Sequence, residues 1–292
     1  MFDRAFRYWA LVPAVLVLGL LTLYPMVQLV RMSLSSLQFV QGGLSWTWVG
    51  LRNFKEIFRD PVAVTAIRNT VLFAVITVIV ETAAGTILAI AANRVVRMAR
   101  FYRVVVMMPI LIPPIAIGVM WLMIVNYNYG VLNELLAAVG ITGPAWLNTG
   151  TLAFAVIIVV DIWHWISFMF IIILAGIESL PVELNEAARI DGASEMQLIR
   201  HVTLPLLRPT ISIAVVLRLI FAFKVFDEIY LLTSGGPGNA NQVVSFYIQD
   251  VFFSQARMGY AAALALAVAI VVVVLVVGYQ RVSATASRRA AA

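Results

Sequence analysis

The sequence predicts an all-α, polytopic membrane protein with six transmembrane helices and both termini in the cytoplasm. Of the 292 residues, 63% are hydrophobic and 12% are charged, whereas a soluble domain is about half apolar and about a quarter charged. Six apolar runs are each long enough to cross a hydrocarbon core about 30 Å thick, because a helix rises about 1.5 Å per residue. The Lys and Arg residues also gather on one side of these runs, as they do in multi-pass proteins.

Polar, turn-rich segments separate the six predicted spans. After the first span, Trp46 and Trp48 are typical of a membrane interface. Pro109, Pro113 and Pro114 interrupt the third span, and such a cluster kinks or splits a helix, whose freed carbonyl groups then need partners within a bundle. The last span is an unusually pure run of Ala, Val and Leu. The spans are predicted at residues 8–30, 66–92, 104–125, 151–177, 210–232 and 259–279.

The distribution of positive charge predicts the orientation. Of the 20 Lys and Arg residues, 12 lie on one side: two before the first span, four in residues 93–103, three in residues 178–209 and three after the last span. Six lie on the opposite side, and Arg218 and Lys224 lie within the fifth span. Because Lys and Arg favour the cytoplasmic side, both termini and residues 178–209 are predicted to be cytoplasmic. This use of positive charge also argues against nucleic-acid binding.

Within residues 178–209, Glu186–Pro209 is the longest polar, helix-forming run of the chain, and this region is predicted to be two short helices joined by a hinge. Pro181 suits the first turn of a helix, and Gly192 suits the left-handed position that ends one. Ser194 and Gln197 have the spacing of a capping box at the start of the second helix.

Pro205 and Pro209 are expected to end this second helix, because proline lacks a backbone N–H group. The first helix combines acidic residues with an apolar stripe of Leu184, Ala187, Ala188 and Ile190. Amphipathic helices that lie on a membrane favour Lys and Arg on their polar face. The acidic character of this helix therefore favours docking to a soluble protein over lying on the membrane surface.

Several short motifs together resemble one family. Within the cytoplasmic segment they are Glu186-Ala187-Ala188, Asp191-Gly192-Ala193, Leu204-Pro205 and Pro209. Elsewhere they are Val49-Gly50-Leu51-Arg52-Asn53-Phe54, Asn69-Thr70, Pro109 with Ile112-Pro113-Pro114, Tyr129-Gly130-Val131-Leu132-Asn133, the run 226–233 and Gly235-Gly236-Pro237. The chain resembles the permease subunit of binding-protein-dependent ABC importers, in the carbohydrate-uptake group related to the maltose and trehalose systems. The resemblance runs from about Pro13 to Tyr279, and Ser167 departs from it where relatives often carry proline.

The resemblance implies a mechanism and a set of partners. Residues 1–292 would be one transmembrane domain, surrounded by lipid in the bacterial inner membrane. The helix at residues 183–191 would be a coupling helix seated in a cleft of a separate ATPase, and two ATPase subunits, a second similar permease and an extracytoplasmic solute-binding protein would complete the importer. The residues implied in coupling are Glu183, Glu186, Ala187, Ala188, Asp191, Gly192, Leu204 and Pro205.

No phosphate-binding loop of the G-x-x-x-x-G-K-[ST] type occurs in the sequence. We therefore expect no cofactor on this chain, with Mg-ATP bound by the partner ATPase. The sequence contains no cysteine, and its two histidines are 37 residues apart, so neither a thiolate nor a metal motif is predicted. We expect a transport subunit without catalytic residues of its own.

Charged residues inside the predicted spans are the candidates for a solute path. Such residues are costly in lipid and face a bundle interior or an aqueous cavity. Lys224 and Glu228 have the i,i+4 spacing of a helical ion pair. Arg218 either lines the path or bonds Glu81 or Asp161 between spans, and the pairing is the favoured interpretation. The candidate path residues are Asp161, Trp163, Arg218, Phe221, Ala222, Val225, Asp227 and Tyr230.

Three alternatives stay open beside a sugar importer. The same class of transporter could carry a polyol or a glycerol-phosphate-type solute. A polytopic membrane enzyme could use Asp161/His164 or Asp227/Glu228 as acid–base pairs, but it leaves the 178–209 segment unexplained. A passive channel is the third alternative, and nothing in the sequence resembles a selectivity-filter repeat.

Overall fold

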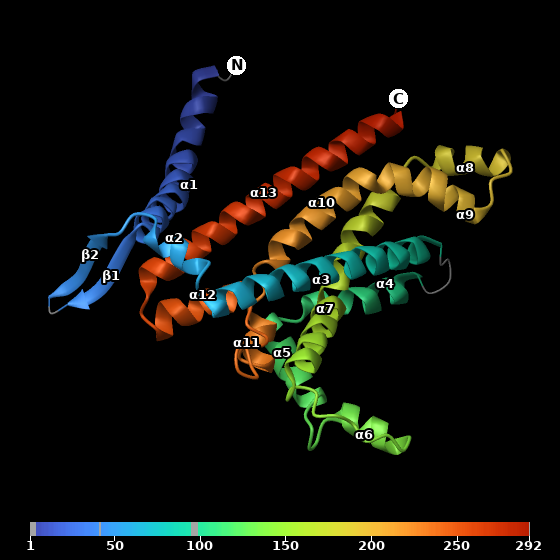
Figure 1. Ribbon diagram of the computed structural model, residues 1–292. Helices are drawn as coiled ribbons and strands as arrows, with labels where there is room; N and C mark the ends of the chain where they lie inside the picture. Colours follow the sequence, from blue (N-terminus) through green and yellow to red (C-terminus); the bar gives the residue numbers. More distant parts are fainter. Residues whose placement is uncertain (1–3, 41, 95–98, 292) are drawn as a thin grey trace. The chain divides into compact units, whose positions relative to one another are not determined.

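The computed structural model describes residues 4–40, 42–94 and 99–291. Arg97, one of the four basic residues in the predicted 93–103 loop, lies outside this part of the chain. Helices dominate the fold (Figure 1). In chain order the elements are α1 (Arg4–Ser33), β1 (Ser35–Val40), β2 (Gly43–Trp48), α2 (Arg52–Ile57), α3 (Pro61–Arg94), α4 (Ala99–Met107), η1 (Met108–Leu111), α5 (Pro114–Ile124), α6 (Val131–Ala138), α7 (Gly150–Glu178), α8 (Val182–Ile190), α9 (Glu195–Leu198), η2 (Ile199–Thr203), α10 (Leu204–Ala222), α11 (Asp227–Leu232), α12 (Val244–Gln249), η3 (Asp250–Ser254) and α13 (Met258–Ala291).

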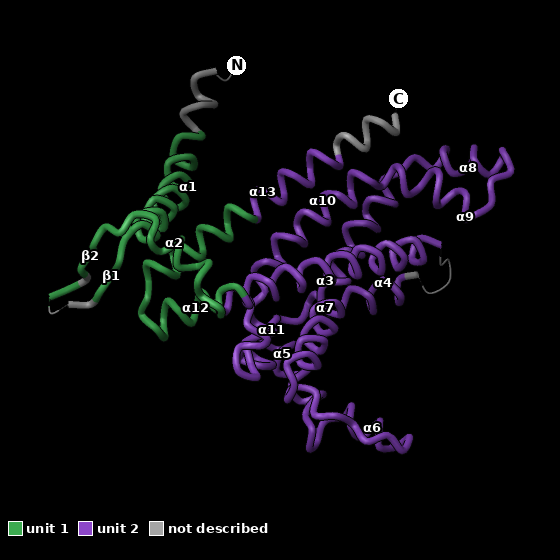
Figure 2. The backbone as a smooth tube through the Cα atoms, in the orientation of Figure 1, with its two compact units in different colours: residues 1–64, 247–271 green, residues 65–246, 272–292 purple. Residues whose placement is uncertain are grey.

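The chain divides into two compact units (Figure 2). The first contains residues 1–64 and 247–271, and the second contains residues 65–246 and 272–292. Each unit therefore combines segments that are far apart in the sequence. The candidate site residues all lie in the second unit.

In the first unit, β1 and β2 form an antiparallel hairpin in which Ser35 lies opposite Trp48 and Val40 opposite Gly43. The sequence predicts a polar, turn-rich segment here and no strands. Trp46 and Trp48 lie two positions apart on one strand, so both side chains leave the same face, and both are exposed. The guanidinium carbon of Arg31, at the end of α1, lies 4.5 Å from the centre of the Trp46 ring.

Asp60 ties three segments of the first unit together. Its Oδ1 accepts hydrogen bonds from the backbone N–H groups of Val62 and Ala63 at the start of α3, at 2.9 and 3.3 Å. Its Oδ2 accepts from the hydroxyls of Tyr247 and Tyr260, at 2.5 and 2.7 Å. Partial burial alone would raise the pKa of Asp60, but the hydrogen bonds from the two tyrosines and the two amides outweigh it and lower the pKa.

The core of the second unit lies between α3, α7 and α10. Its buried apolar residues include Ala89 and Ala92 of α3, Phe170 and Ile173 of α7, and Leu207 of α10. Small residues permit this packing, because a Cβ added at Gly85 in α3 would lie only 2.6 Å from the Cβ of Met169 in α7. Likewise, a Cβ at Gly176 in α7 would lie 2.7 Å from Cγ2 of Thr210 in α10. Three spans are therefore in direct contact at these points.

The long apolar helices agree with the predicted multi-pass helical architecture, but the β1–β2 hairpin departs from the predicted all-α fold. In the described part of the chain, five helices are long and apolar enough to cross a membrane. A sixth candidate is the pair 100–111 and 114–124, which is bent by 97° at the proline cluster. The prolines thus split the third predicted span rather than merely kinking it. The five unbroken candidates are Leu11–Ser33, Pro61–Arg94, Gly150–Glu178, Glu195–Ala222 and Met258–Ser283.

The expectation that Pro205 and Pro209 end a helix is wrong. The helix continues from Glu195 to Ala222, with Pro205 in the first turn of α10 and Pro209 inside it. A π-helical turn, η2, precedes Pro205, and within it the N–H of Leu204 donates to the carbonyl of Ile199, five residues back. The extra residue in this turn changes the hydrogen-bond register just where proline offers no donor. The fifth span therefore begins in the polar segment.

The fifth span also ends earlier than predicted. Helix α10 ends at Ala222, four residues follow without helix, and α11 begins at Asp227. This break separates Lys224 from Glu228, so the helical i,i+4 spacing does not apply, and the expected ion pair between them is absent from the interactions of the described residues. Lys224 is exposed instead, and Glu228 is buried.

Two predicted loops contain further helical structure. The predicted loop at residues 126–150 includes α6, and the predicted loop at residues 233–258 includes α12 and the π-helical segment η3. Helix α7 runs unbroken through Ser167, where relatives often carry proline. The hydroxyl of Ser167 donates to the carbonyl of Val106, 2.6 Å away, so this side chain joins α7 to α4.

Candidate functional site

Helix α8 is an exposed helix on the surface of the second unit. None of its nine residues is buried, and Ile190 at its C-terminal end is 86% exposed. The predicted coupling helix at 183–191 corresponds to this element with a shift of one residue. Glu183, Glu186 and Ala187 are exposed and Ala188 is half-buried. The helix therefore offers acidic and small apolar side chains to another molecule.

The turn after α8 has the geometry that the sequence predicted for Gly192. Gly192 has φ +80°, which lies in the left-handed region, and no atom lies within 4 Å of the Cβ position. Backbone conformation rather than space therefore requires glycine here. The N–H of Ala193 donates to the carbonyl of Ala188 at 3.0 Å, which is the long hydrogen bond of a Schellman motif. Asp191 is the C-cap residue and is exposed.

The predicted capping box at the start of α9 is present. The backbone N–H of Gln197 donates to the hydroxyl of Ser194 at 3.4 Å, and the amide oxygen of Gln197 accepts from the backbone N–H of Ser194 at 2.8 Å. This box fixes the first residue of a helix that then continues as α10. Helix α9 and the fifth span are consequently parts of one helix, Glu195–Ala222.

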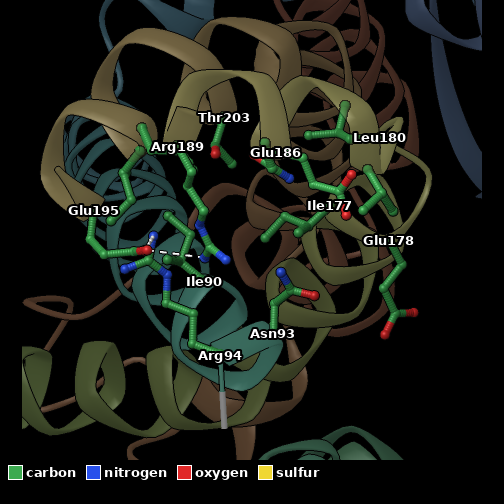
Figure 3. A pocket seen from close by; sticks show the side chains of 14 residues that line it. Ile90, Asn93, Arg94, Ile177, Glu178, Leu180, Glu186, Arg189, Glu195 and Thr203 are labelled. Atoms are coloured by element: carbon green, nitrogen blue, oxygen red, sulfur yellow. Dashed lines mark hydrogen bonds and ion pairs between the residues drawn. The ribbon is translucent and has the colours of Figure 1, made fainter. Parts of the chain in front are cut away.

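Glu195 joins three elements at this surface. Its Oε2 lies 2.8 Å from Nη2 of Arg94 at the end of α3, and its Oε1 lies 3.0 Å from Nη2 of Arg189 in α8 (Figure 3). Glu195, Arg94 and Arg189 are not among the site residues predicted from the sequence. The sequence does contain a signal for this contact. Glu195 is an acidic residue directly after the N-cap residue Ser194, and basic residues occur both in the α8 segment and at the end of α3.

A pocket of about 790 Å³ lies beneath α8 (Figure 3). Ile90 and Ile177, at the ends of α3 and α7, are apolar parts of its lining, whereas Glu186 and Arg189 line it from α8. The lining reaches Thr203 and stops before Leu204 and Pro205, which are half-buried at the start of α10. Six of the eight predicted coupling residues thus lie on or directly after α8, and two lie where the spanning helix begins.

A cluster of buried charges occupies the interior of the second unit. We define the ion cluster as Glu81 of α3, Asp161 of α7 and Arg218 of α10. Arg218 donates through Nε to Oε2 of Glu81 at 2.5 Å and through Nη2 to Oε1 of Glu81 at 2.9 Å. The same Nη2 also donates to Oδ2 of Asp161. The pairing that the sequence analysis favoured is therefore present with both carboxylates.

A second buried pair lies beside the ion cluster. Nδ1 of His164 in α7 lies 3.7 Å from Oε1 of Glu228 in α11, and both side chains are at most 5% exposed. The guanidinium of Arg218 packs 4.9 Å from the ring centre of Trp165, and that ring stacks on Phe221 at 5.0 Å. No group of three or more His, Cys, Asp or Glu side chains in the described ranges has the arrangement of a metal site.

The eight predicted path residues are not gathered on one open surface. Asp161 and Arg218 are each 1% exposed, and Ala222 and Val225 are also buried, so these four do not line an open path in this conformation. Trp163 and Asp227 are half-buried. Phe221 is 39% exposed and Tyr230 is 51% exposed, and they are the path candidates that the structure leaves accessible.

The chain is similar in sequence to known membrane transport proteins. A family model described as "Binding-protein-dependent transport system inner membrane component" matches residues 81–288. The chain is 36% identical to the sulfoquinovosyl glycerol transport system permease protein SmoG of Agrobacterium fabrum, over 90% of this chain and 85% of that protein. It is 37% identical to the trehalose/maltose transport system permease protein MalF of Thermococcus litoralis, over 68% of this chain and 67% of that protein.

Among solved structures, the chain is similar to one in a bacterial alginate ABC transporter in complex with an alginate pentasaccharide-bound periplasmic protein. The TM-score is 0.85 at 26% sequence identity, and the match covers 97% of this chain and 96% of that one. The two chains therefore share one fold over nearly their whole lengths.

Proposed function

Because the chain belongs to the family of binding-protein-dependent transport system inner membrane components, we propose that it is the permease subunit of an ATP-driven importer for a sugar or sugar derivative. Members of this family are multi-pass proteins of the inner membrane, in agreement with the apolar helices found here. The single observation that carries the proposal is α8, an exposed helix joined through Ser194 and Glu195 to a membrane-spanning helix. In this proposal, residues 1–292 act as one transmembrane domain.

We propose that α8 is the docking element for a separate ATPase subunit. Its exposed acidic residues, Glu183 and Glu186, suit a cationic cleft, and Ala187 allows close contact. Mg-ATP would be bound and hydrolysed by that subunit and not by this chain. Movement of α8 during the ATPase cycle would then be passed directly to the spanning helix that begins at Glu195.

The complete importer in this proposal contains this chain, a second homologous permease, two ATPase subunits and an extracytoplasmic solute-binding protein. One solved relative contains a periplasmic protein with a bound alginate pentasaccharide. A corresponding protein would deliver the solute to this permease on the side opposite α8.

The proposed solute class rests on the relatives. Some matched proteins are described as sn-glycerol-3-phosphate transport system permease proteins. Three others are described as transporting sulfoquinovosyl glycerol, trehalose/maltose and alginate. All three names contain a sugar or a sugar derivative. Within the permease, we propose that Phe221 and Tyr230 contact the solute, because aromatic faces stack on sugar rings and these two side chains are accessible.

Copurification tests the docking proposal directly. The chain is expressed with a candidate ATPase subunit of an ABC importer, and the amount of ATPase retained on the tagged permease is measured. We expect Glu186→Lys and Gly192→Val to reduce this amount at least fivefold. The first reverses a charge on α8, and the second places a β-branched residue at φ +80°.

Two matched substitutions control for general damage. Glu134→Lys reverses an exposed charge on α6, and Gly140→Val places the same residue at a left-handed position, φ +77°. Both should retain wild-type amounts of ATPase. Equal retention by all four variants, or no ATPase on the wild-type chain, would contradict the proposal. Calorimetry of the binding protein with trehalose, maltose, an acidic oligosaccharide and glycerol phosphate would then test the solute class.

A further inference from the structure

The ion cluster of Glu81, Asp161 and Arg218 has no part in the proposed docking surface or solute path. Glu81 is 0% exposed, and the other two residues are each 1% exposed. A passing solute or an ATPase bound at α8 therefore touches none of them in this conformation. Any effect of these three residues on transport must therefore come from the way they hold α3, α7 and α10 against one another.

The chemistry of the cluster suits fixing the orientation of helices more than it suits adding stability. Buried ion pairs add little stability, because apolar residues of the same volume often hold helices together equally well. A guanidinium instead offers donors in a rigid, planar fork. In the cluster, Nε and Nη2 of Arg218 hold both oxygens of Glu81, and Nη2 also reaches Asp161. These bonds fix the rotation and register of α10 against α3 and α7.

One continuous helix connects the cluster with the exposed surface. It runs from Glu195 to Ala222 through α9, η2 and α10, so Arg218 lies 23 residues after Glu195, about 35 Å along the axis. At its first residue, Glu195 is paired with Arg189 of α8 and Arg94 of α3. The surface ion pairs and the buried ion cluster are therefore located near opposite ends of the same helix.

The cluster also contacts the aromatic residues nearest the proposed path. The guanidinium of Arg218 lies 4.9 Å from the ring centre of Trp165, which is stacked on Phe221 at 5.0 Å. Trp163, two residues before Trp165 in α7, packs edge-on against Trp121 of α5 at 5.8 Å. A displacement of Arg218 relative to α7 would change the surroundings of these rings.

We infer that the ion cluster is the joint that carries movement of the α8–α9 segment from α10 to α3 and α7. This inference rests on the proposed function, because it takes α8 to be moved by an ATPase. Arg218 is then a positioning residue. It acts through Glu81, Asp161 and Trp165 without contacting the solute.

The test uses the whole importer, reconstituted in lipid nanodiscs, and a thiol reporter in α7. Because the chain has no cysteine, Trp163→Cys supplies its only thiol. The rate of its reaction with N-ethylmaleimide is measured without nucleotide and after trapping with Mg-ATP and vanadate. With the cluster intact, we expect trapping to change this rate at least fivefold, because α7 moves with α10.

The decisive variant is Glu81→Gln/Asp161→Asn/Arg218→Met, which removes all three charges together and leaves none unpaired. We expect it to retain vanadate trapping while the change in reporter rate falls below twofold. A change equal to that of the intact cluster would overturn the inference. Glu56→Gln/Arg257→Met removes an exposed ion pair in the first unit and should leave the reporter response unchanged.

A second variant keeps the test decisive if the uncharged triple variant fails to assemble. Arg218→Lys retains the positive charge but lacks the planar fork, and we expect its reporter response to be reduced at least twofold. A full response from Arg218→Lys would overturn the inference. If the wild-type chain recruits no ATPase, the proposed function fails instead, and copurification shows this before any reporter is measured.

Discussion

The guanidinium of Arg218 holds Glu81 in a bidentate pair, although 137 residues separate them in the chain. Asp161 shares the same guanidinium, so two carboxylates depend on one cation in a fully buried position. Each residue comes from a different helix, α3, α7 or α10. The stability of the second unit therefore depends on these charges being matched to one another, and removing one of them leaves the others buried without a partner.

Removing Arg218 alone should be more damaging than removing the whole cluster. Arg218→Met leaves Glu81 and Asp161 buried without a cation, and we expect the free energy of unfolding to fall by about 3–5 kcal/mol. The variant Glu81→Gln/Asp161→Asn/Arg218→Met should recover most of this loss. Thermal unfolding in detergent, followed by tryptophan fluorescence, measures both. A triple variant less stable than Arg218→Met would contradict this account.

Close contact between α3 and α7 at Gly85 leads to a second prediction. A Cβ at this position would lie 2.6 Å from Cβ of Met169 and 3.2 Å from the backbone nitrogen of Phe170. Because a backbone atom cannot move aside easily, we expect Gly85→Ala to cost about 1–3 kcal/mol of unfolding free energy.

Gly278→Ala is the matched control for Gly85→Ala. Gly278 lies in α13, and no atom lies within 4 Å of its Cβ position. Alanine is favoured over glycine in a helix by about 1 kcal/mol, so this variant should keep or raise the unfolding temperature. Similar losses in the two variants would show that helix packing at Gly85 is looser than the structure indicates.

The hydrogen bonds of Asp60 predict that the free energy of unfolding depends on pH in the acidic range. Its pKa is lowered in the folded chain, so its contribution is present above the ordinary carboxylate value, about 3.9. The contribution is lost as the pH falls through the lowered pKa. We expect Asp60→Asn to lower stability at pH 7 by about 1–2 kcal/mol, a modest value because the carboxylate is partly exposed.

The difference between wild type and Asp60→Asn should shrink as the pH is lowered below about 4, because the carboxyl of the unfolded chain is protonated there before the carboxyl of the folded chain. Unfolding temperatures measured from pH 7 to pH 3 check this. Tyr247→Phe removes one of the two hydroxyl donors and should show a smaller loss at pH 7. A constant difference across the range would contradict the assignment.

Local signals in the sequence predicted much of the exposed segment. Gly192 adopts the left-handed conformation, and Ser194 and Gln197 form the capping box. The prolines around Pro113 split the third span. In each case the residue type restricts its own backbone, or a neighbour three residues away supplies the partner. Such effects do not depend on the rest of the fold.

Features that depend on distant segments were not predictable in the same way. The prolines at 205 and 209 remain inside a helix because a π-helical turn precedes them and the whole segment packs into a span. Glu195 forms an ion pair with Arg94, which lies about a hundred positions away in the sequence. The sequence predicts that Arg218 pairs with Glu81 or Asp161, but only the packing of α3, α7 and α10 shows that it holds both.

The orientation of the chain is a prediction from positive charge, and cysteine labelling tests it. Because the sequence has no cysteine, a single introduced thiol reports its own side of the membrane. Ile190→Cys in α8 and Val139→Cys after α6 are suitable, since these side chains are 86% and 70% exposed. The charge distribution predicts that Ile190 lies in the cytoplasm and Val139 on the opposite side.

Spheroplasts that produce the chain without its partners are treated with a membrane-impermeant maleimide before and after permeabilisation. Val139→Cys should be labelled equally in both conditions, because it already faces the medium. Ile190→Cys should be labelled at least tenfold more after permeabilisation, because the bilayer shields it until then. The reverse pattern would invert the orientation and place α8 where no cytoplasmic ATPase can reach it, which would contradict the docking proposal as well.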